Sequence, residues 1–144
     1  MIEQDTIRLL RECDAGVKMG ISSISDVMDY VHSEHFKTIL NDCKQAHEKL
    51  DCEITQQLSS YHDDGKSPNT MAKAMSFAKT SVKLAMNDTD ATIADLMTDG
   101  CNMGVKSLNK YLNKYTAADE NSKNITKRLI DLEQNLAIDV RQYL

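Results

Sequence analysis

The chain has 144 residues, enough for a single domain with a substantial core, and its 41% hydrophobic and 27% charged residues, one Pro and no Trp suit an all-helical protein rather than a β-sheet or disordered one. A net charge of −5 without any Lys/Arg cluster argues against a nucleic-acid partner. The chain has no apolar run of about 18 residues and no signal-peptide core, so we expect a cytoplasmic protein without membrane association.

Two long helices are predicted in the first half of the chain. From Glu3 to His32 apolar residues recur at alternating spacings of three and four, which keeps them on one helical face. This stripe consists of Ile7, Leu10, Val17, Ile21, Ile24, Met28 and Val31, and Asp14 is its one polar interruption. Ser33 is a suitable N-cap for the second helix. The inward stripe of this second helix is Phe36, Leu40, Cys43, His47, Leu50, Ile54, Gln57 and Tyr61.

The segment 62–68 is the one clear interruption of the helical pattern. Gly65 suits the C-terminus of the second helix, and Ser67-Pro68 suits the cap and first residue of the next helix. A shorter amphipathic helix is then predicted over residues 71–86. Because this long connection contains its own helix, the second half can return alongside the first, and we do not expect a simple up-down-up-down chain.

Two more long helices are predicted in the second half. Asp88 or Thr89 can cap the first of them, which extends to about Tyr115. The polar segment 116–122 leads into the last helix. The inward stripe of the last helix is Ile125, Leu129, Leu132, Leu136, Val140 and Tyr143.

The two halves of the chain resemble each other. Residues 16–21 (GVKMGI) return as residues 100–105 (GCNMGV), and the second and last helices correspond at an offset of 86 residues. This internal similarity predicts a bundle of two related helical hairpins. Each glycine within a helix costs about 1 kcal/mol relative to alanine, so we expect a neighbouring backbone to approach closely and compensate. The glycines concerned are Gly16, Gly20, Gly100 and Gly104.

Two short motifs around the third long helix are similar to a known family. Residues 82–86 (VKLAM), an Asp-bearing turn and residues 93–96 (IADL) precede the Gly100 segment. In this respect the chain resembles the ferritin-like family, and within it small bacterial four-helix proteins of unknown function related to rubrerythrin and ferritin. Those relatives pass similarly through a short crossover helix into a helix that carries a Gly-Glu pair. The resemblance covers nearly the whole chain and implies one ferritin-like four-helix bundle domain over residues 1–144, with a short extra helix in the crossover.

The metal site that the resemblance implies is degenerate in this chain. Ferritin-like di-iron sites use one inward Glu on each of two helices and a Glu-x-x-His motif on each of the other two. Where the relatives' Glu would follow the glycine, this chain has Val17 and Cys101, and no Glu-x-x-His occurs anywhere. We therefore expect no di-iron cofactor.

The predicted centre of the bundle is nevertheless polar. His47 corresponds to Glu133 at the 86-residue offset, and Asp14 corresponds to Thr98 at the 84-residue offset. One interpretation is a buried imidazole–carboxylate pair between His47 and either Glu133 or Asp14, satisfied by Thr98, since a lone buried charge is costly. We expect the inward polar and thiol groups to lie within about two helical turns of each other. These groups are Asp14, Cys43, His47, Cys101 and Glu133.

A second interpretation of the same centre is a residual mononuclear metal site. His47, Glu133 and one of Asp14, Cys43 or Cys101 offer nitrogen, oxygen and sulfur ligands that suit a single zinc or iron ion. The cysteines are widely spaced without a C-x-x-C pair, which is more simply explained by buried free thiols than by disulfides. The methionines, including the matching pair at 19 and 103, are interpreted as flexible core residues rather than copper ligands.

The sequence offers no positive support for an enzyme, because no nucleophile–base arrangement, phosphate loop or nucleotide fingerprint occurs. The first hypothesis is a non-catalytic protein that forms a homodimer or binds a protein partner, with Tyr111, Tyr115 and the crossover methionines as exposed contacts. The second is the metalloprotein. The third is a histidine phosphotransfer module, because residues 46–50 (AHEKL) resemble its phosphorylatable segment; this alternative requires an exposed His47.

Overall fold

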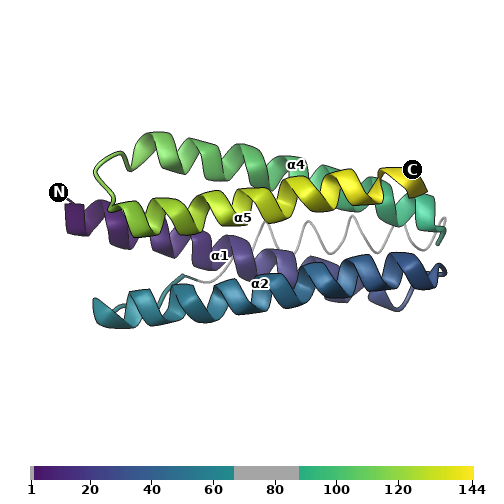
Figure 1. The fold of residues 1–144 in the computed structure, drawn as a ribbon, viewed down its shortest axis with the longest axis horizontal. Coiled ribbons are helices and arrows are strands. Elements are labelled where there is room, and N and C mark those ends of the chain that lie inside the picture. Colours follow the sequence, from purple (N-terminus) through teal and green to yellow (C-terminus); the bar gives the residue numbers. More distant parts are fainter. Residues whose placement is uncertain (1, 67–87) are drawn as a thin grey trace.

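A computed structural model of the chain describes residues 2–66 and 88–144, and the regular structure of these residues is entirely helical. It consists of α1 (Ile2–Met28), α2 (Glu34–Ser60), α4 (Asp90–Lys114), α5 (Glu120–Asp139) and the short 3₁₀ helix η1 (Val140–Tyr143), as Figure 1 shows. The all-α, four-helix prediction is confirmed. The helix predicted over residues 71–86 lies outside the described residues. None of the described helices is long and apolar enough to span a membrane.

Hydroxyl and carboxylate side chains set where the helices begin. The Ser33 Oγ accepts a hydrogen bond from the Phe36 backbone N–H at 3.2 Å, which confirms Ser33 as the N-cap of α2. Thr89, rather than Asp88, caps α4. The N-cap of α5 is Asp119, which the apolar pattern does not predict; its carboxylate accepts a hydrogen bond from the Ser122 N–H at 2.7 Å. The last helix therefore begins earlier than its apolar stripe indicates.

The C-terminus of α2 differs from the prediction. The helix ends at Ser60, and His62, not Gly65, adopts the left-handed conformation that closes it, with φ of 58°. The N–H groups of His62 and Asp63 donate to the carbonyls of Ser59 and Leu58, both at 3.0 Å, which is the Schellman pattern. Gly65 has a left-handed φ of 87° in the following segment, where a Cβ would overlap the Asp14 carboxylate.

The four long helices pair as two hairpins. The helix α1 packs against α2, and α4 packs against α5, while contacts of α2 with α5 and of α1 with α4 join the hairpins. Asp90, the first residue of α4, accepts hydrogen bonds from the backbone N–H groups of His32 and Ser33 at 2.8 and 3.0 Å. The helices α2 and α4 therefore start at the same end of the bundle and run in the same direction (Figure 1).

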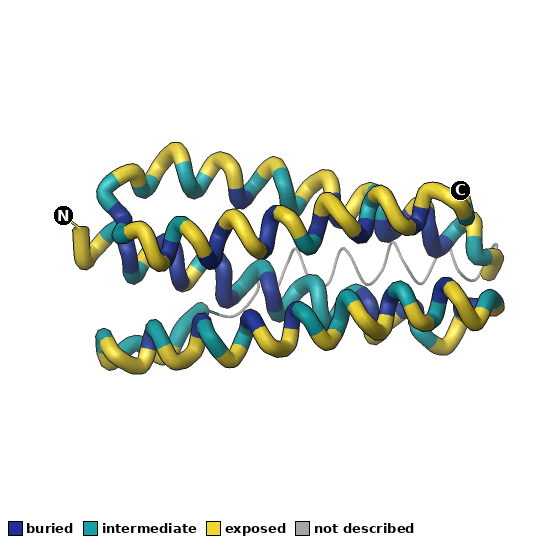
Figure 2. The backbone as a smooth tube through the Cα atoms, viewed as in Figure 1, coloured by how far each residue is buried: buried dark blue, intermediate teal, exposed yellow. Residues whose placement is uncertain are grey.

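The core is divided into two apolar clusters, one toward each end of the bundle. Figure 2 shows the buried residues along the inward faces of the helices. One cluster contains Phe36, Leu40 and Leu136, and the other contains Leu50 and Leu129. Burial on α1 is broader than the predicted stripe, because α1 contacts α2, α4 and α5. The buried α1 residues outside that stripe are Thr6, Leu9, Cys13 and Val27.

Candidate functional site

A histidine and a glutamate meet between the two apolar clusters. His47 on α2 is fully buried, and its Nε2 lies 2.9 Å from Oε1 of Glu133 on α5. Only 9% of the Glu133 surface is exposed. Of the two pairs that the sequence left open, the structure therefore contains His47 with Glu133. The same pairing places a polar layer between the two apolar clusters of the core.

Two helical glycines leave room for this pair. A Cβ on Gly20 would lie 2.8 Å from the Cδ2 and Nε2 atoms of His47, and a Cβ on Gly104 would lie 3.6 Å from the Glu133 carboxylate. The expected approach of a neighbouring backbone is wrong, because the nearest atoms are side-chain atoms. A Cβ on Gly16 would likewise meet only the tips of two leucines, and one on Gly100 would meet no described residue within 4 Å.

The hydrogen bonds of the His47 ring constrain its protonation. Its Nδ1 lies 2.8 Å from the backbone carbonyl of Cys43, which can only accept, so Nδ1 carries a proton. One further proton then lies between Nε2 and Glu133, and the pair has no net charge whichever partner holds it. Burial lowers the pKa of His47, but the interactions with the side chains of Cys43 and Glu133 outweigh burial and raise it to about 10. At neutral pH the His47 ring is therefore positively charged.

Two thiols complete this centre. The Cys43 Sγ lies 3.5 Å from the Nδ1 of His47, on the side of the ring away from Glu133. Cys101 is buried, and burial first, then the adjacent Glu133 carboxylate, raise the pKa of its thiol well above the ordinary value. Cys101 is therefore a neutral thiol. The structure thus brings together Cys43, His47, Cys101 and Glu133, as the sequence predicted.

Asp14 has other hydrogen-bond partners, so the alternative pair of His47 with Asp14 is not formed. Its carboxylate is buried, with Oδ1 2.6 Å from the Lys18 Nζ and Oδ2 accepting the Lys66 backbone N–H at 2.9 Å. Asp14 therefore holds the segment that follows α2. Nearby, one oxygen of Asp51 is buried without a hydrogen-bond partner among the described residues. Thr98 donates to the Ala94 carbonyl in its own helix at 2.7 Å, so its hydroxyl proton is not given to the His47–Glu133 pair.

Of the remaining cysteines and methionines, some are buried as predicted and others are exposed. Cys13 is buried against the Thr126 hydroxyl at 3.1 Å, and burial raises the pKa of its thiol to about 12. Cys52 is exposed, so the expectation that every cysteine is buried is wrong. Met103 is 71% exposed, so it is not a core residue either. All four cysteines are free thiols.

The predicted tyrosine contacts are less exposed than expected. Tyr111 and Tyr115 are both half-buried and stack with ring centroids 6.3 Å apart. The Lys114 Nζ lies 5.4 Å from the Tyr115 ring centroid. Burial, and then the Glu12 carboxylate, raise the pKa of Tyr111. These rings are thus largely engaged within the molecule.

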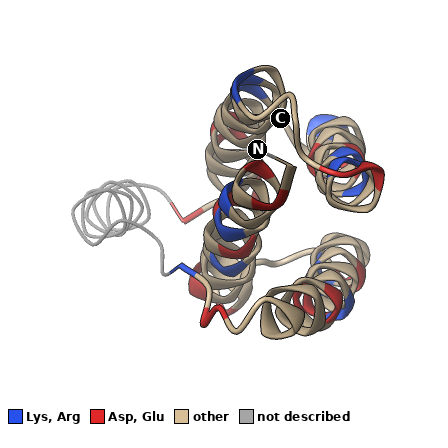
Figure 3. Ribbon diagram, turned by 90° about the vertical axis from the view of Figure 1, so that its left-hand side faces the viewer, with Lys and Arg blue, Asp and Glu red and all other residues tan. Residues whose placement is uncertain are grey.

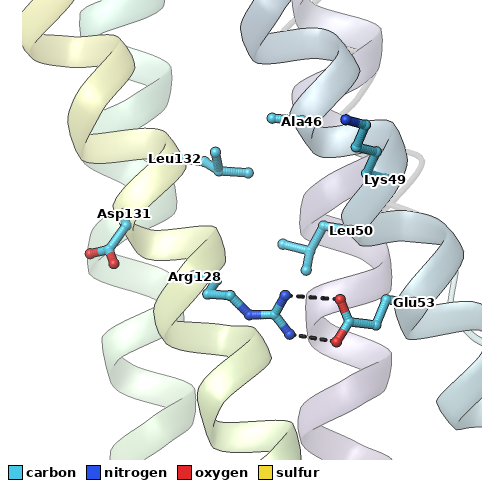
Figure 4. A pocket seen from close by; sticks show the side chains of 7 residues that line it. All are labelled: Ala46, Lys49, Leu50, Glu53, Arg128, Asp131 and Leu132. Atoms are coloured by element: carbon cyan, nitrogen blue, oxygen red, sulfur yellow. Dashed lines mark hydrogen bonds and ion pairs between the residues drawn. The ribbon is translucent and has the colours of Figure 1, made fainter.

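Sequence reasoning missed a groove between α2 and α5, shown in Figure 4. It encloses about 360 Å³. The Arg128 guanidinium crosses it and donates to both oxygens of Glu53, at 2.9 and 2.5 Å. Its lining residues are exposed or half-buried except for Leu50, and most are polar, so hydropathy periodicity gives no signal for it. The lining residues are Ala46, Lys49, Leu50, Glu53, Arg128, Asp131 and Leu132.

The chemistry that the centre can support is limited. Across residues 2–66 and 88–144 no group of three or more His, Cys, Asp or Glu side chains converges closely enough to hold a metal ion. Both nitrogens of His47 are engaged and the ring is buried, whereas phosphotransfer requires an exposed imidazole. Charges of both signs are interspersed over the described helices (Figure 3). Comparison of the chain with models of protein families, with curated proteins and with solved structures finds no match.

Proposed function

We propose that this chain is a ferritin-like bundle of two repeated hairpins that acts by associating with protein, in the first instance with a second copy of itself, rather than by catalysis. The observation that carries this proposal is the closed centre. His47 is fully buried, bonded to Glu133 at 2.9 Å and flanked by the neutral thiol of Cys101. A buried pair that satisfies itself is poorly suited to receive a substrate, so function is better sought on the outer faces of the helices.

The ferritin-like, repeated part of the proposal has its own support. His47 and Glu133 correspond at the 86-residue offset, and Gly20 and Gly104 correspond at the 84-residue offset. Both glycines adjoin that pair, one from each hairpin. The helices α2 and α4 also run in the same direction, which requires one long crossover of the kind found in ferritin-like bundles.

Sedimentation equilibrium on the purified chain tests the proposed association. Across a concentration series from about 1 to several hundred micromolar, the range in which moderate homodimers dissociate, we expect a mass that rises toward twice 16.2 kDa. A constant mass of 16.2 kDa over the whole series would show that the chain does not associate with itself.

A second candidate function is a metalloprotein with one zinc or iron ion at the centre. One observation favours it: the His47 Nδ1 donates to the Cys43 carbonyl, an orientation typical of metal-binding histidines, while Nε2 faces Glu133. The described side chains would have to move to converge on an ion. Elemental analysis of chain purified without chelator tests it. Stoichiometric metal that is lost in His47→Ala and Glu133→Ala supports this candidate, and metal-free chain whose Tm does not respond to added zinc or iron contradicts it.

A further inference from the structure

The groove between α2 and α5 has an apolar floor and a charged rim. In Figure 4 the side chains of Ala46, Leu50 and Leu132 point into the space between the two helices. Lys49 and Asp131 are both exposed, on opposite helices of the groove. Neither side chain takes part in an ion pair within 4.0 Å among the described residues, so both charges are available to another molecule.

The charges on the two sides of the groove have opposite signs at matching heights. Lys49 lies two residues after His47, and Asp131 lies two residues before Glu133. Because α2 and α5 run in opposite directions and His47 meets Glu133, both residues lie about 3 Å from that contact along the bundle, on the same side of it. The Glu53–Arg128 ion pair, further along, confirms that the two helices remain level.

This pattern is complementary to itself. A two-fold axis parallel to the bundle brings α2 of one copy against α5 of the other at the same height. Lys49 then faces the partner's Asp131, and Asp131 faces the partner's Lys49. Glu53 likewise faces the partner's Arg128, and Arg128 faces the partner's Glu53. The apolar floors of the two grooves cover each other at the centre.

We propose that the α2–α5 groove is the surface on which a second copy of this chain binds, in this two-fold arrangement. The inference rests on the proposed self-association and names its surface. An exposed apolar side chain on the same face supports it: Ile138 is 51% exposed and lies seven residues, about two helical turns, beyond Asp131. Arginine and apolar residues at the centre with charges at the rim are typical of protein interfaces.

Charge reversal with complementation tests the arrangement by sedimentation equilibrium. Lys49→Glu alone and Asp131→Lys alone each place like charges opposite one another at two symmetric points, so we expect each to weaken the dimer at least about tenfold. An equimolar mixture of the two variants restores opposite charges at both points and should form a heterodimer. The double variant Lys49→Glu/Asp131→Lys should dimerise like the unmodified chain.

The matched control is Lys106→Glu, a charge reversal at an exposed position of α4 outside the groove. It should leave the dimer unchanged, and its mixture with Asp131→Lys should restore nothing. Because all three positions are exposed, we expect every variant to fold, and circular dichroism of each variant checks this. If the unmodified chain dimerises and neither groove variant weakens the dimer, or if the mixture fails to restore it, the interface proposal is overturned while self-association stands. If the unmodified chain is monomeric, self-association itself fails.

Discussion

His47 and Glu133 occupy corresponding positions in the two hairpins, 86 residues apart, and hydrogen-bond directly to each other. Each hairpin therefore contributes one residue of this contact, His47 from α2 and Glu133 from α5. Gly20 and Gly104, also corresponding, adjoin the pair on α1 and α4. The centre of the bundle is thus shared by both hairpins, but it is chemically asymmetric, because a base faces an acid.

Replacing one partner of this pair by leucine should lower the free energy of unfolding far more than replacing both partners. Glu133→Leu leaves the buried imidazole without its carboxylate, and we expect a loss of about 3 kcal/mol in the free energy of unfolding. His47→Leu/Glu133→Leu restores an apolar contact and should regain most of that loss. Urea denaturation of His47→Leu, Glu133→Leu and the double variant measures the coupling between the two residues. Losses that simply add in the double variant would contradict this.

The stability of the fold should decrease between about pH 6.5 and 10. The pKa of His47 is raised from its ordinary value of 6.5 to about 10, so the folded state retains a proton that the unfolded state has released. Its stabilising contribution is complete below pH 6.5 and is lost as the pH rises through 10, with a slope of at most about 1.4 kcal/mol per pH unit. Urea denaturation at pH 6.5, 8 and 9.5 measures the slope. The His47→Leu/Glu133→Leu variant is the control, and an equal slope in that variant would contradict the prediction.

The two glycines beside the pair should respond oppositely to alanine. A Cβ at Gly20 would lie 2.8 Å from the His47 ring, so Gly20→Ala must displace the ring and should destabilise the fold by about 2 kcal/mol. At Gly104 the nearest atoms would be 3.6 Å away, an ordinary contact, so Gly104→Ala should gain helix propensity of about 0.5–1 kcal/mol. Thermal and urea unfolding of both variants measure this difference. Two changes of the same sign would contradict the geometry.

Thiol reactivity should single out Cys52. Cys52 is exposed, whereas Cys13 and Cys101 are buried and burial raises the pKa of both thiols, to about 12 for Cys13. With a maleimide at pH 7.5, peptide mass spectrometry should find Cys52 modified first and these two cysteines modified only as the chain unfolds. Labelling in urea is the control, since all four thiols should then react alike. Rapid labelling of Cys101 in the native chain would show that the centre opens.

The sequence predicts well what depends on helical periodicity. The stripes correctly place His47 and Glu133 inward, and Ser33 at the start of α2. Periodicity also places Asp14 inward correctly, but it cannot show that the Lys66 backbone, 52 residues later, reaches that carboxylate. The sequence predicts the end of α2 at Gly65, because glycine adopts the left-handed conformation most easily. The structure instead uses His62 there and needs Gly65 for the space beside Asp14.

The groove could not be predicted for a related reason. Lys49 and Asp131 are exposed charges, which a periodicity argument assigns to solvent without relating one to the other. Their relation depends on the height at which α2 meets α5. That height follows from the His47–Glu133 contact, which the 86-residue correspondence suggests but which only the three-dimensional arrangement gives.

The polar layer between the two apolar clusters also restricts how the helices can assemble. If α5 slid along α2 by one turn, the carboxylate of Glu133 would leave the imidazole and stand opposite an aliphatic neighbour such as Leu50, with no donor to replace the one it lost. Misaligned bundles would therefore be rejected at this single level, although leucines on either side of it could interdigitate in several alignments. The contact between His47 and Glu133 thus fixes the alignment of α5 along α2.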